Sequence, residues 1–175
     1  MRKIWIAVAT VMACFIFVSL SCAVSISGSV GSGSYQWSDS NSSALFTNGN
    51  TFGAKLRVGL TQSFGVGLSY TTWETETIAV PRITADWTAT DLTADYTFWM
   101  VPVVKPYIGA GVGNYTSSFS GGGSSSDMGL IFFGGVSVKI LKGLYIDYGL
   151  DYHTIFTSGQ NTQMTGQHFG IALAI

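Results

Sequence analysis

Charged side chains are scarce in this chain, and several of them recur at a spacing that could support chemistry. Asp91 and Asp95 lie four residues apart, and so do Asp147 and Asp151. On a β-strand this spacing places both carboxylates of a pair on one face, where they could serve as general acid and general base. Nearby lysine and arginine side chains would keep the carboxylates ionised, which suits ion pairs better than acid catalysis. The spacing therefore predicts structural ion pairs, and we expect no catalytic residue among them.

The two histidines, His153 and His168, are the other candidates for chemistry. A lipid-modifying enzyme could use a histidine together with a serine, but the sequence neighbours are Thr154 and Gln167. A two-histidine metal site would need a third ligand, and Asp151 is the one candidate nearby in the sequence. We therefore expect both histidines at strand ends or loop bases, and we expect no metal site and no cofactor.

The elements that must position these side chains are β-strands. Residues 51–60 and 64–73 each alternate between apolar residues and small or polar residues. A period of two indicates strands, because successive side chains leave opposite faces. Each run has ten residues, within the length of about 9–11 that a tilted strand needs to cross a bilayer. Further strands are predicted at about residues 87–98, 106–115, 128–140 and 144–153, with a first strand starting at residue 24 and a last one ending at residue 175.

The first of these eight strands contains an irregularity. Tyr35 and Trp37 lie on the opposite parity from Val30. A bulge near Gly31 and Gly33 would account for the change of face, because a bulge inserts one extra residue into a strand. The sequence therefore predicts a bulge at this point.

The first 23 residues have the features of a secretory signal. Arg2 and Lys3 precede an apolar stretch, and the small residues Ser21 and Ala23 flank a cleavage position after Ala23. This predicts Sec-type export, a signal peptide at residues 1–23 and a domain at residues 24–175. A membrane anchor and lipidation of Cys22 are the alternatives. With Cys14 also inside the signal, cleavage after Ala23 would leave no cysteine for disulfides or thiolate chemistry.

Composition argues for strands that cross a membrane. Charged residues make up 10% of the chain, against about 25% in soluble domains. After the signal there are six basic and nine acidic residues, a net charge of −3 without a basic patch, so nucleic acid is not an expected partner. No later apolar run is long enough for a membrane helix. The chain is thus too apolar for a soluble domain, yet it has no predicted membrane helix. Strands that close into a barrel resolve this conflict, because closure pairs every backbone group.

The predicted connections alternate in length. Short ones fall near Gln62, Pro102 and Lys142, and long ones cover residues 38–50, 74–85, 116–127 and 154–165. Membrane barrels show the same pattern, with short periplasmic turns and longer loops outside the cell.

Alternation alone leaves open whether the apolar face points outward or inward, as it would in a soluble ligand-binding barrel. The opposite face is rich in Gly, Ser and Thr and poor in charge, which suits the crowded interior of an eight-stranded barrel better than a solvated exterior. Aromatic residues near strand ends are typical of membrane-interface girdles. The predicted girdle consists of Tyr70, Trp73, Trp87, Phe98, Trp99, Tyr115 and Tyr152.

With the apolar face outward, the charged residues of the strands point into the barrel. Buried charges must be paired, so we predict an ion-pair network that fills the lumen. Its members are Lys55, Arg57, Asp91, Asp95, Lys139, Asp147 and Asp151. The alternative interpretation is a polar path for small solutes or ions.

The segment Lys105–Gly113, KPYIGAGVG, supports this interpretation through a resemblance. It resembles the Pro-Tyr-apolar-Gly-Ala-Gly-apolar-Gly segment of small eight-stranded outer-membrane barrels of Gram-negative bacteria, the outer membrane protein A/X and opacity-type group. The alternating last strand resembles the insertion signal read by the barrel-assembly machinery, although it ends in Ile175 where Phe is usual.

The resemblance implies an all-β, eight-stranded antiparallel up-and-down transmembrane barrel in the cell outer membrane. Its implied partners are outer-membrane lipid, lipopolysaccharide and, during insertion, the barrel-assembly machinery. We expect a structural or surface-interaction role, adhesion included, through four extracellular loops. A narrow channel is the alternative, and a lipid-modifying enzyme is a more remote one.

Overall fold

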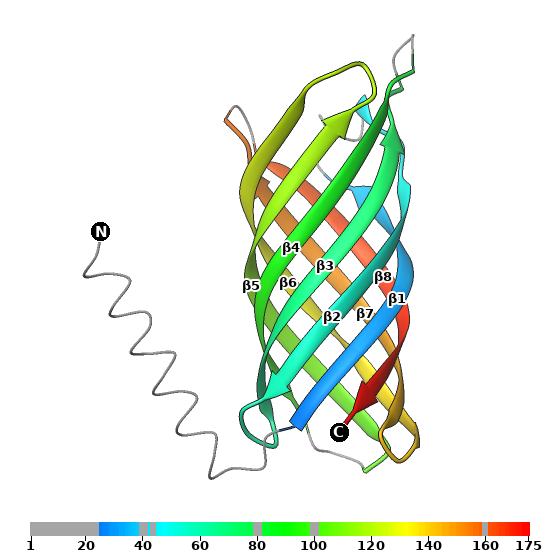
Figure 1. Ribbon diagram of the computed structural model, residues 1–175, viewed down its shortest axis with the longest axis vertical. Helices are drawn as coiled ribbons and strands as arrows, with labels where there is room; N and C mark the ends of the chain where they lie inside the picture. The colour runs from blue at the N-terminus through cyan, green and yellow to red at the C-terminus, as the bar shows by residue number, and fades with distance from the viewer. Residues whose placement is uncertain (1–24, 39–41, 43–44, 79–81, 99–101, 159–160) are drawn as a thin grey trace, which may run out of the picture.

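The computed structural model describes residues 25–38, 42, 45–78, 82–98, 102–158 and 161–175. The predicted signal peptide, both cysteines and Trp99 lie outside these residues. Eight strands form one closed, antiparallel barrel in which each strand pairs with its sequence neighbours and β1 pairs with β8 (Figure 1). The strands are β1 (Ser25–Trp37), β2 (Gly49–Gly59), β3 (Phe64–Glu76), β4 (Thr84–Thr97), β5 (Val104–Phe119), β6 (Ser124–Leu141), β7 (Leu144–Phe156) and β8 (Thr162–Ala174). The predicted fold class is confirmed.

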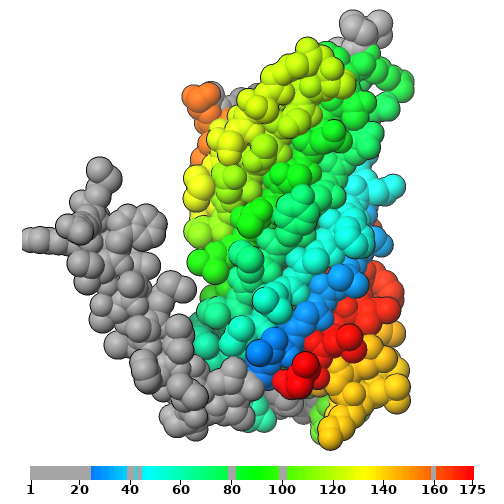
Figure 2. Space-filling view, viewed as in Figure 1, coloured from blue at the N-terminus to red at the C-terminus, as the bar shows by residue number. Residues whose placement is uncertain are grey.

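The apolar face of the alternating strands points outward. Leu56, Leu68 and Leu150 are each more than half exposed, although each lies in the middle of its strand. The space-filling view shows the strands of one face, β1 to β5, packed side by side into a continuous wall (Figure 2). An outer surface of this kind is suited to lipid rather than to water, so the outward orientation predicted from composition is confirmed.

The predicted bulge in β1 is wrong. The pairing of β1 with β2 runs without a shift from Ser25 opposite Gly59 to Tyr35 opposite Gly49. Tyr35 and Trp37 therefore keep the inward parity and are buried inside the barrel. A register shift occurs instead between Lys139 and Leu141, where β6 turns into β7.

The connections at the two ends of the barrel differ less than predicted. At one end, which we call the turn end, residues 60–63, 98–103 and 142–143 join the strands, and the chain ends there as well (Figure 1). At the opposite loop end, residues 38–48, 77–83, 120–123 and 157–161 join them. Among the described residues, no helix is long and apolar enough to span a membrane.

The predicted loop at 116–127 is mostly strand. β5 continues to Phe119 and β6 begins at Ser124, so only residues 120–123 form the turn. Gly122 and Gly123 adopt φ values of 92° and 106° there, which favour glycine. The serines on either side pair with each other across the hairpin, because backbone pairing requires no large side chain.

Candidate functional site: the barrel lumen

The lumen contains a cavity of about 700 Å³. At the turn end its mouth is lined by exposed residues of the turns and the C-terminus, among them Thr61, Lys142 and Ile175. Its inner end is lined by Tyr35 and Asp91. Serines, threonines and most of the charged side chains of the strands line this cavity, because they have the inward parity.

Above this cavity, toward the loop end, the lumen is filled by a cluster that we call the aromatic plug. Its buried members are Tyr35, Trp37, Trp73, Ala85, Trp87, Ala89, Tyr115, Ile155 and Met164. The rings of Trp73 and Trp87 are stacked, 5.9 Å apart and 9° from parallel. Trp37 lies 5.3 Å from Trp87 at a tilt of 60°. Aromatic pairs add about 0.5–1.5 kcal/mol each beyond the area that they bury, so the plug is a well-packed closure.

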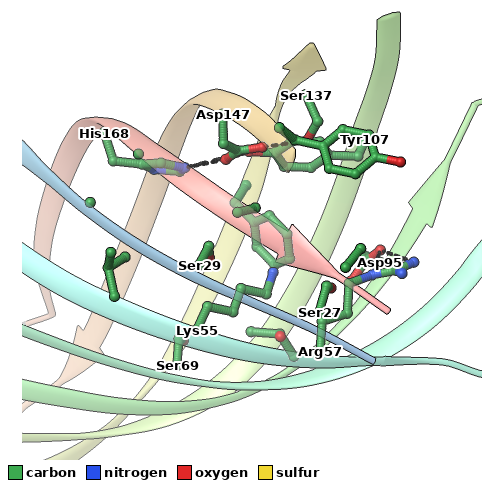
Figure 3. A pocket seen from close by; sticks show the side chains of 18 of the residues that line it. Ser27, Ser29, Lys55, Arg57, Ser69, Asp95, Tyr107, Ser137, Asp147 and His168 are labelled. Carbon is green, nitrogen blue, oxygen red and sulfur yellow. Dashed lines mark hydrogen bonds and ion pairs between the residues drawn. The ribbon is translucent and has the colours of Figure 1, made fainter. Parts of the chain in front are cut away.

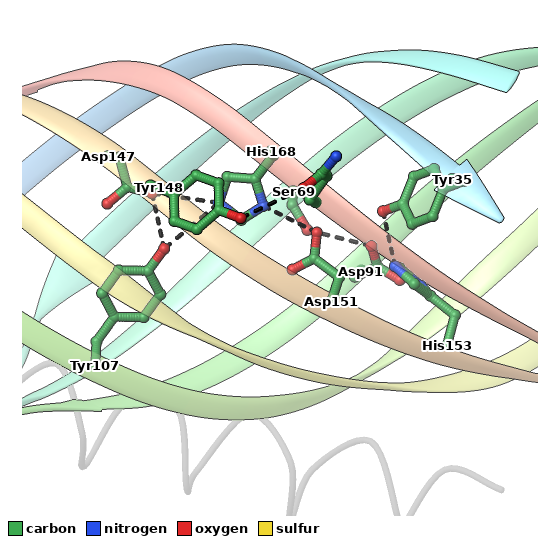
Figure 4. Close-up of polar contacts among 10 residues, drawn as sticks. Tyr35, Ser69, Asp91, Tyr107, Asp147, Tyr148, Asp151, His153 and His168 are labelled. Atoms are coloured by element: carbon green, nitrogen blue, oxygen red, sulfur yellow. Dashed lines mark hydrogen bonds and ion pairs between the residues drawn. The ribbon is translucent and has the colours of Figure 1, made fainter.

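A hydrogen-bonded bridge crosses the barrel at the height of the aromatic plug, and we call it the Tyr–His–Tyr bridge. His153 Nε2 lies 2.8 Å from the Tyr35 hydroxyl and His153 Nδ1 lies 2.7 Å from the Tyr115 hydroxyl. Figure 4 shows His153 and Tyr35 facing each other inside the barrel. Tyr35 belongs to β1 and Tyr115 to β5, which lie opposite each other in a ring of eight strands. The bridge therefore spans the lumen.

These positions overturn part of the predicted girdle. Trp73, Trp87 and Tyr115 are buried inside the barrel rather than placed at its outer surface. They have the same odd parity as the inward charges, so proximity to a strand end was a misleading signal and parity would have placed them correctly. Tyr70 and Phe98 do lie on the outside, and Tyr152 is half-buried, so for these three the girdle remains a prediction.

Both histidines also differ from expectation. His153 is 1% exposed and is hydrogen-bonded to two residues of the aromatic plug, Tyr35 and Tyr115. His168 lines the cavity, with Nδ1 2.9 Å from Asp151 Oδ2 and Nε2 3.3 Å from Asp147 Oδ2. Each ring nitrogen faces a carboxylate, and only the imidazolium form can donate through both nitrogens. His168 is thus a luminal cation that the sequence prediction missed, although it alternates with the lipid-facing Phe169.

Asp147 is the most extensively bonded carboxylate of the lumen. Besides His168 it accepts hydrogen bonds from Tyr107, at 2.7 Å, and from Ser137 (Figures 3 and 4). Ser137 donates to the carboxylate and not to His168, so this group lacks the nucleophile–base contact that hydrolytic catalysis requires. Among the described residues, no group of three or more potential ligands could hold a metal ion.

One ion pair of the predicted network, between Arg57 and Asp95, is formed as a bidentate contact. Arg57 Nε lies 2.8 and 2.9 Å from the two carboxylate oxygens of Asp95, and Nη2 lies 2.8 Å from Oδ2 (Figure 3). The Asp95 side chain is 3% exposed and that of Arg57 is 21% exposed. A planar guanidinium bound to a carboxylate in this way fixes orientation as well as charge.

The other predicted members are not joined into one network. Lys55 Nζ lies 4.1 Å from the centre of the Phe133 ring, and Asp91 accepts a bond of 3.2 Å from Ser69. Lys139 is exposed near the mouth of the cavity. The lumen therefore contains separate charged groups, and the closure comes from aromatic packing rather than from ion pairs.

A closed barrel with an apolar exterior, and with its charged side chains turned inward beneath a plug, defines a transmembrane β-barrel of the outer-membrane type. Residues 10–175 match the family model described as "Outer membrane protein beta-barrel domain". The chain belongs to this family and is an integral outer-membrane protein. In this family the short turns face the periplasm, which places the turn end on that side and the loop end at the cell surface.

Solved structures show the same fold. Neisserial surface protein A superposes with a TM-score of 0.66 at 18% identity, covering 86% of this chain and 95% of its own. Ail of Yersinia pestis, in complex with the heparin analogue sucrose octasulfate, gives a TM-score of 0.62 at 19% identity, covering 87% of this chain and 99% of its own. The N-terminal barrel of Pseudomonas aeruginosa OprF gives 0.55 at 18% identity, covering 86% and 97%. No curated protein sequence matches this chain. At these identities the likeness concerns the fold.

Proposed function

We propose that this protein is a non-conducting outer-membrane barrel that presents an interaction surface at its loop end. The observation that carries the proposal is the aromatic plug, which fills the lumen on the extracellular side while the cavity opens toward the periplasm. A barrel that ends in packed tryptophans is suited to holding surface segments in place. It is poorly suited to passing solutes.

Among the described residues, the β5–β6 hairpin contains the two longest strands. Its strands have 16 and 18 residues, against 11–14 in the other strands. The tip carries exposed Gly121–Gly123, and the exposed serines at 124–126 follow it. Such a hairpin offers backbone and hydroxyl groups on a rigid base, a composition that favours hydrogen-bonded contact with a protein partner.

The charge of the loop end limits the kind of partner. Its described charged residues are the acidic Glu74, Glu76, Asp86 and Asp127 and the basic Arg82, which pairs with Glu76 at 3.5 Å. Glu74 and Asp86 lie directly opposite each other on neighbouring strands. The structure of Ail described above contains the heparin analogue sucrose octasulfate. Because like charges repel, the acidic loop end of this chain does not favour a sulfated polyanion.

Adherence measurements test the surface role. Replacing residues 118–124 by Asn-Gly keeps Ser117 opposite Ser125 and leaves a two-residue turn. We expect this variant to fold but to lose most of the adherence that expression of the protein confers on a non-adherent Gram-negative host. Lys142→Asn, a change in a turn on the periplasmic side, is the matched control and should keep adherence. Equal adherence of hairpin variant and parent would refute the proposed role of the hairpin.

A narrow channel is the second candidate, and the charged and hydroxyl-bearing side chains of the cavity favour it. The plug is held mainly by packing, because the indole nitrogens of Trp73 and Trp87 have no hydrogen-bond partner among the described residues. Planar-bilayer recording separates the two functions. We expect no conductance steps from the parent protein and steady conductance from the Trp73→Ala/Trp87→Ala variant. Conductance in the parent equal to that of the variant would favour the channel.

A further inference from the structure

We propose that the luminal cavity is a binding site for a small organic anion that enters from the periplasm, with Lys55 as the cation that holds it. The ligand class that fits is a carboxylate with a small apolar body. This site is separate from the surface role, because it lies on the other side of the plug.

The first argument is a charge imbalance inside the cavity. Its lining includes six cationic side chains, with His168 counted as imidazolium, and four side-chain carboxylates, with the last residue, Ile175, at the mouth. The cations are Lys55, Arg57, Lys105, Lys139, Lys142 and His168, and the carboxylates are Asp91, Asp95, Asp147 and Asp151. An excess of positive charge in a lumen surrounded by lipid attracts anions, since the low-dielectric wall focuses the field.

The second argument is how these charges are satisfied. Each of the four carboxylates accepts a hydrogen bond from a neighbouring side chain. Asp91 has one oxygen without a partner among the described residues, but this atom packs against Gly113 in the wall. By contrast, the ion pairs of the described residues include neither Lys55, Lys139 nor Lys142. The groups still able to bind a ligand are therefore the cations.

The third argument is the surroundings of Lys55. Its ammonium lies over the ring of Phe133, a contact that leaves N–H donors for another acceptor. Ser29 and Ser69 lie directly opposite Lys55 on the neighbouring strands, on the same inward face, and Figure 3 shows them around it. Ile131, like Phe133, is buried in the cavity wall. An ammonium with a hydroxyl beside it and an apolar wall behind it matches a carboxylate attached to a small apolar group.

The mouth of the cavity provides the entry path. Lys139 and Lys142 are exposed there, so an anion in the periplasm is attracted before it enters. The cavity volume of about 700 Å³ lies within the range of small-molecule sites, about 300–1,000 Å³. Because the plug closes the far end, an anion that reaches Lys55 is retained rather than passed on.

Calorimetric titration of the refolded full barrel in detergent micelles tests the proposal. The probes are benzoate, the neutral benzamide of the same shape, and benzylammonium. We expect saturable benzoate binding at least tenfold tighter than that of either other probe. Lys55→Met should weaken benzoate binding at least tenfold. Arg82→Met, which removes a cation from the loop end, is the matched control and should bind benzoate as the parent does.

Three results would overturn the proposal: no saturable benzoate binding, equal affinity for benzamide, or parental affinity in the Lys55→Met barrel. Heat-modified electrophoretic migration verifies that each variant is folded. Should Lys55→Met fail to fold, Ser29→Leu narrows the cavity beside Lys55 while keeping the charge. The Ser29→Leu barrel must then bind benzoate more weakly than the parent, and parental affinity in it would also overturn the proposal. Neither substitution alters the loop end, so adherence stays at the parental level whatever the titrations show.

Discussion

The Tyr–His–Tyr bridge gives the sharpest test of how the lumen is held together. His153→Leu removes the central group of the bridge with little change in volume. It leaves two tyrosine hydroxyls without their partner, on strands that lie opposite each other. A buried hydroxyl that loses its partner costs about 1–3 kcal/mol, so the substitution should destabilise the barrel beyond the loss of two ordinary hydrogen bonds.

The two tyrosines should contribute unequally. Tyr35 lines the cavity, so its hydroxyl can form a hydrogen bond to water there. The stability lost through the unpaired Tyr35 hydroxyl is therefore at the low end, about 1 kcal/mol. Tyr115 is 1% exposed and does not line the cavity, so its share falls at the high end, about 2–3 kcal/mol. The expected loss for His153→Leu is therefore about 3–4 kcal/mol, or roughly two to three powers of ten in the folding equilibrium constant.

Removing all three polar groups together should cost less than removing one. In the triple variant Tyr35→Phe/His153→Leu/Tyr115→Phe no bridge atom is left unpaired, and apolar replacement of both partners is close to neutral, within about 1.5 kcal/mol. Adding Tyr115→Phe to His153→Leu should recover more stability than adding Tyr35→Phe.

Equilibrium urea unfolding in lipid vesicles, followed by tryptophan fluorescence, measures these differences. Gel migration of unheated samples verifies that each variant starts folded. If the triple variant were less stable than His153→Leu alone, the losses would be additive. In that case the bridge would contribute as separate contacts, and the argument from unpaired hydroxyls would fail.

Two further predictions use the same assay. Arg57→Met leaves the buried Asp95 carboxylate without its cation and should lower the free energy of unfolding by about 3 kcal/mol. Adding Asp95→Asn should restore most of this stability, and additive losses for the two substitutions would contradict the pairing. Gly166→Ala places a methyl group against the ring of Tyr35 and should destabilise the barrel by about 1–3 kcal/mol. Gly28→Ala is the control and should be neutral, because the atom nearest to its added methyl group lies 4.0 Å away. Equal effects of the two substitutions would argue against tight packing at Gly166.

The number of strands and the lipid-facing side could be predicted from the sequence because both follow from a period of two. Alternation in a run such as residues 51–60 fixes the faces of that strand whatever its neighbours are. The strand ends could not be predicted in the same way. Residues 116–119 and 124–127 carry no apolar alternation, and they become strand because each finds a hydrogen-bonded partner in the hairpin.

The candidate site was only partly predictable for a related reason. Parity alone places Trp73 and Trp87 inside with Lys55, so the plug was within reach of the sequence. The pairing of His168 with Asp147 was not. It depends on how β7 and β8 align, and on the heights that this alignment gives to side chains from separate strands. Tilt and shear determine these heights, and a one-dimensional pattern does not contain them.

The glycines show how a narrow barrel can hold large side chains at all. In several places, a large inward residue lies directly opposite a glycine on the neighbouring strand, and a methyl group at that glycine would overlap it. Three examples are Tyr35 with Gly166, Phe133 with Gly109, and His168 with Gly149. The same pairing supports the plug, the wall beside Lys55 and the Asp147–His168 group. The 22 glycines of the chain therefore do more than permit curvature. Each of these three makes room for one side chain that closes or lines the lumen, so the position of a glycine on one strand determines which large residue its neighbour can turn inward.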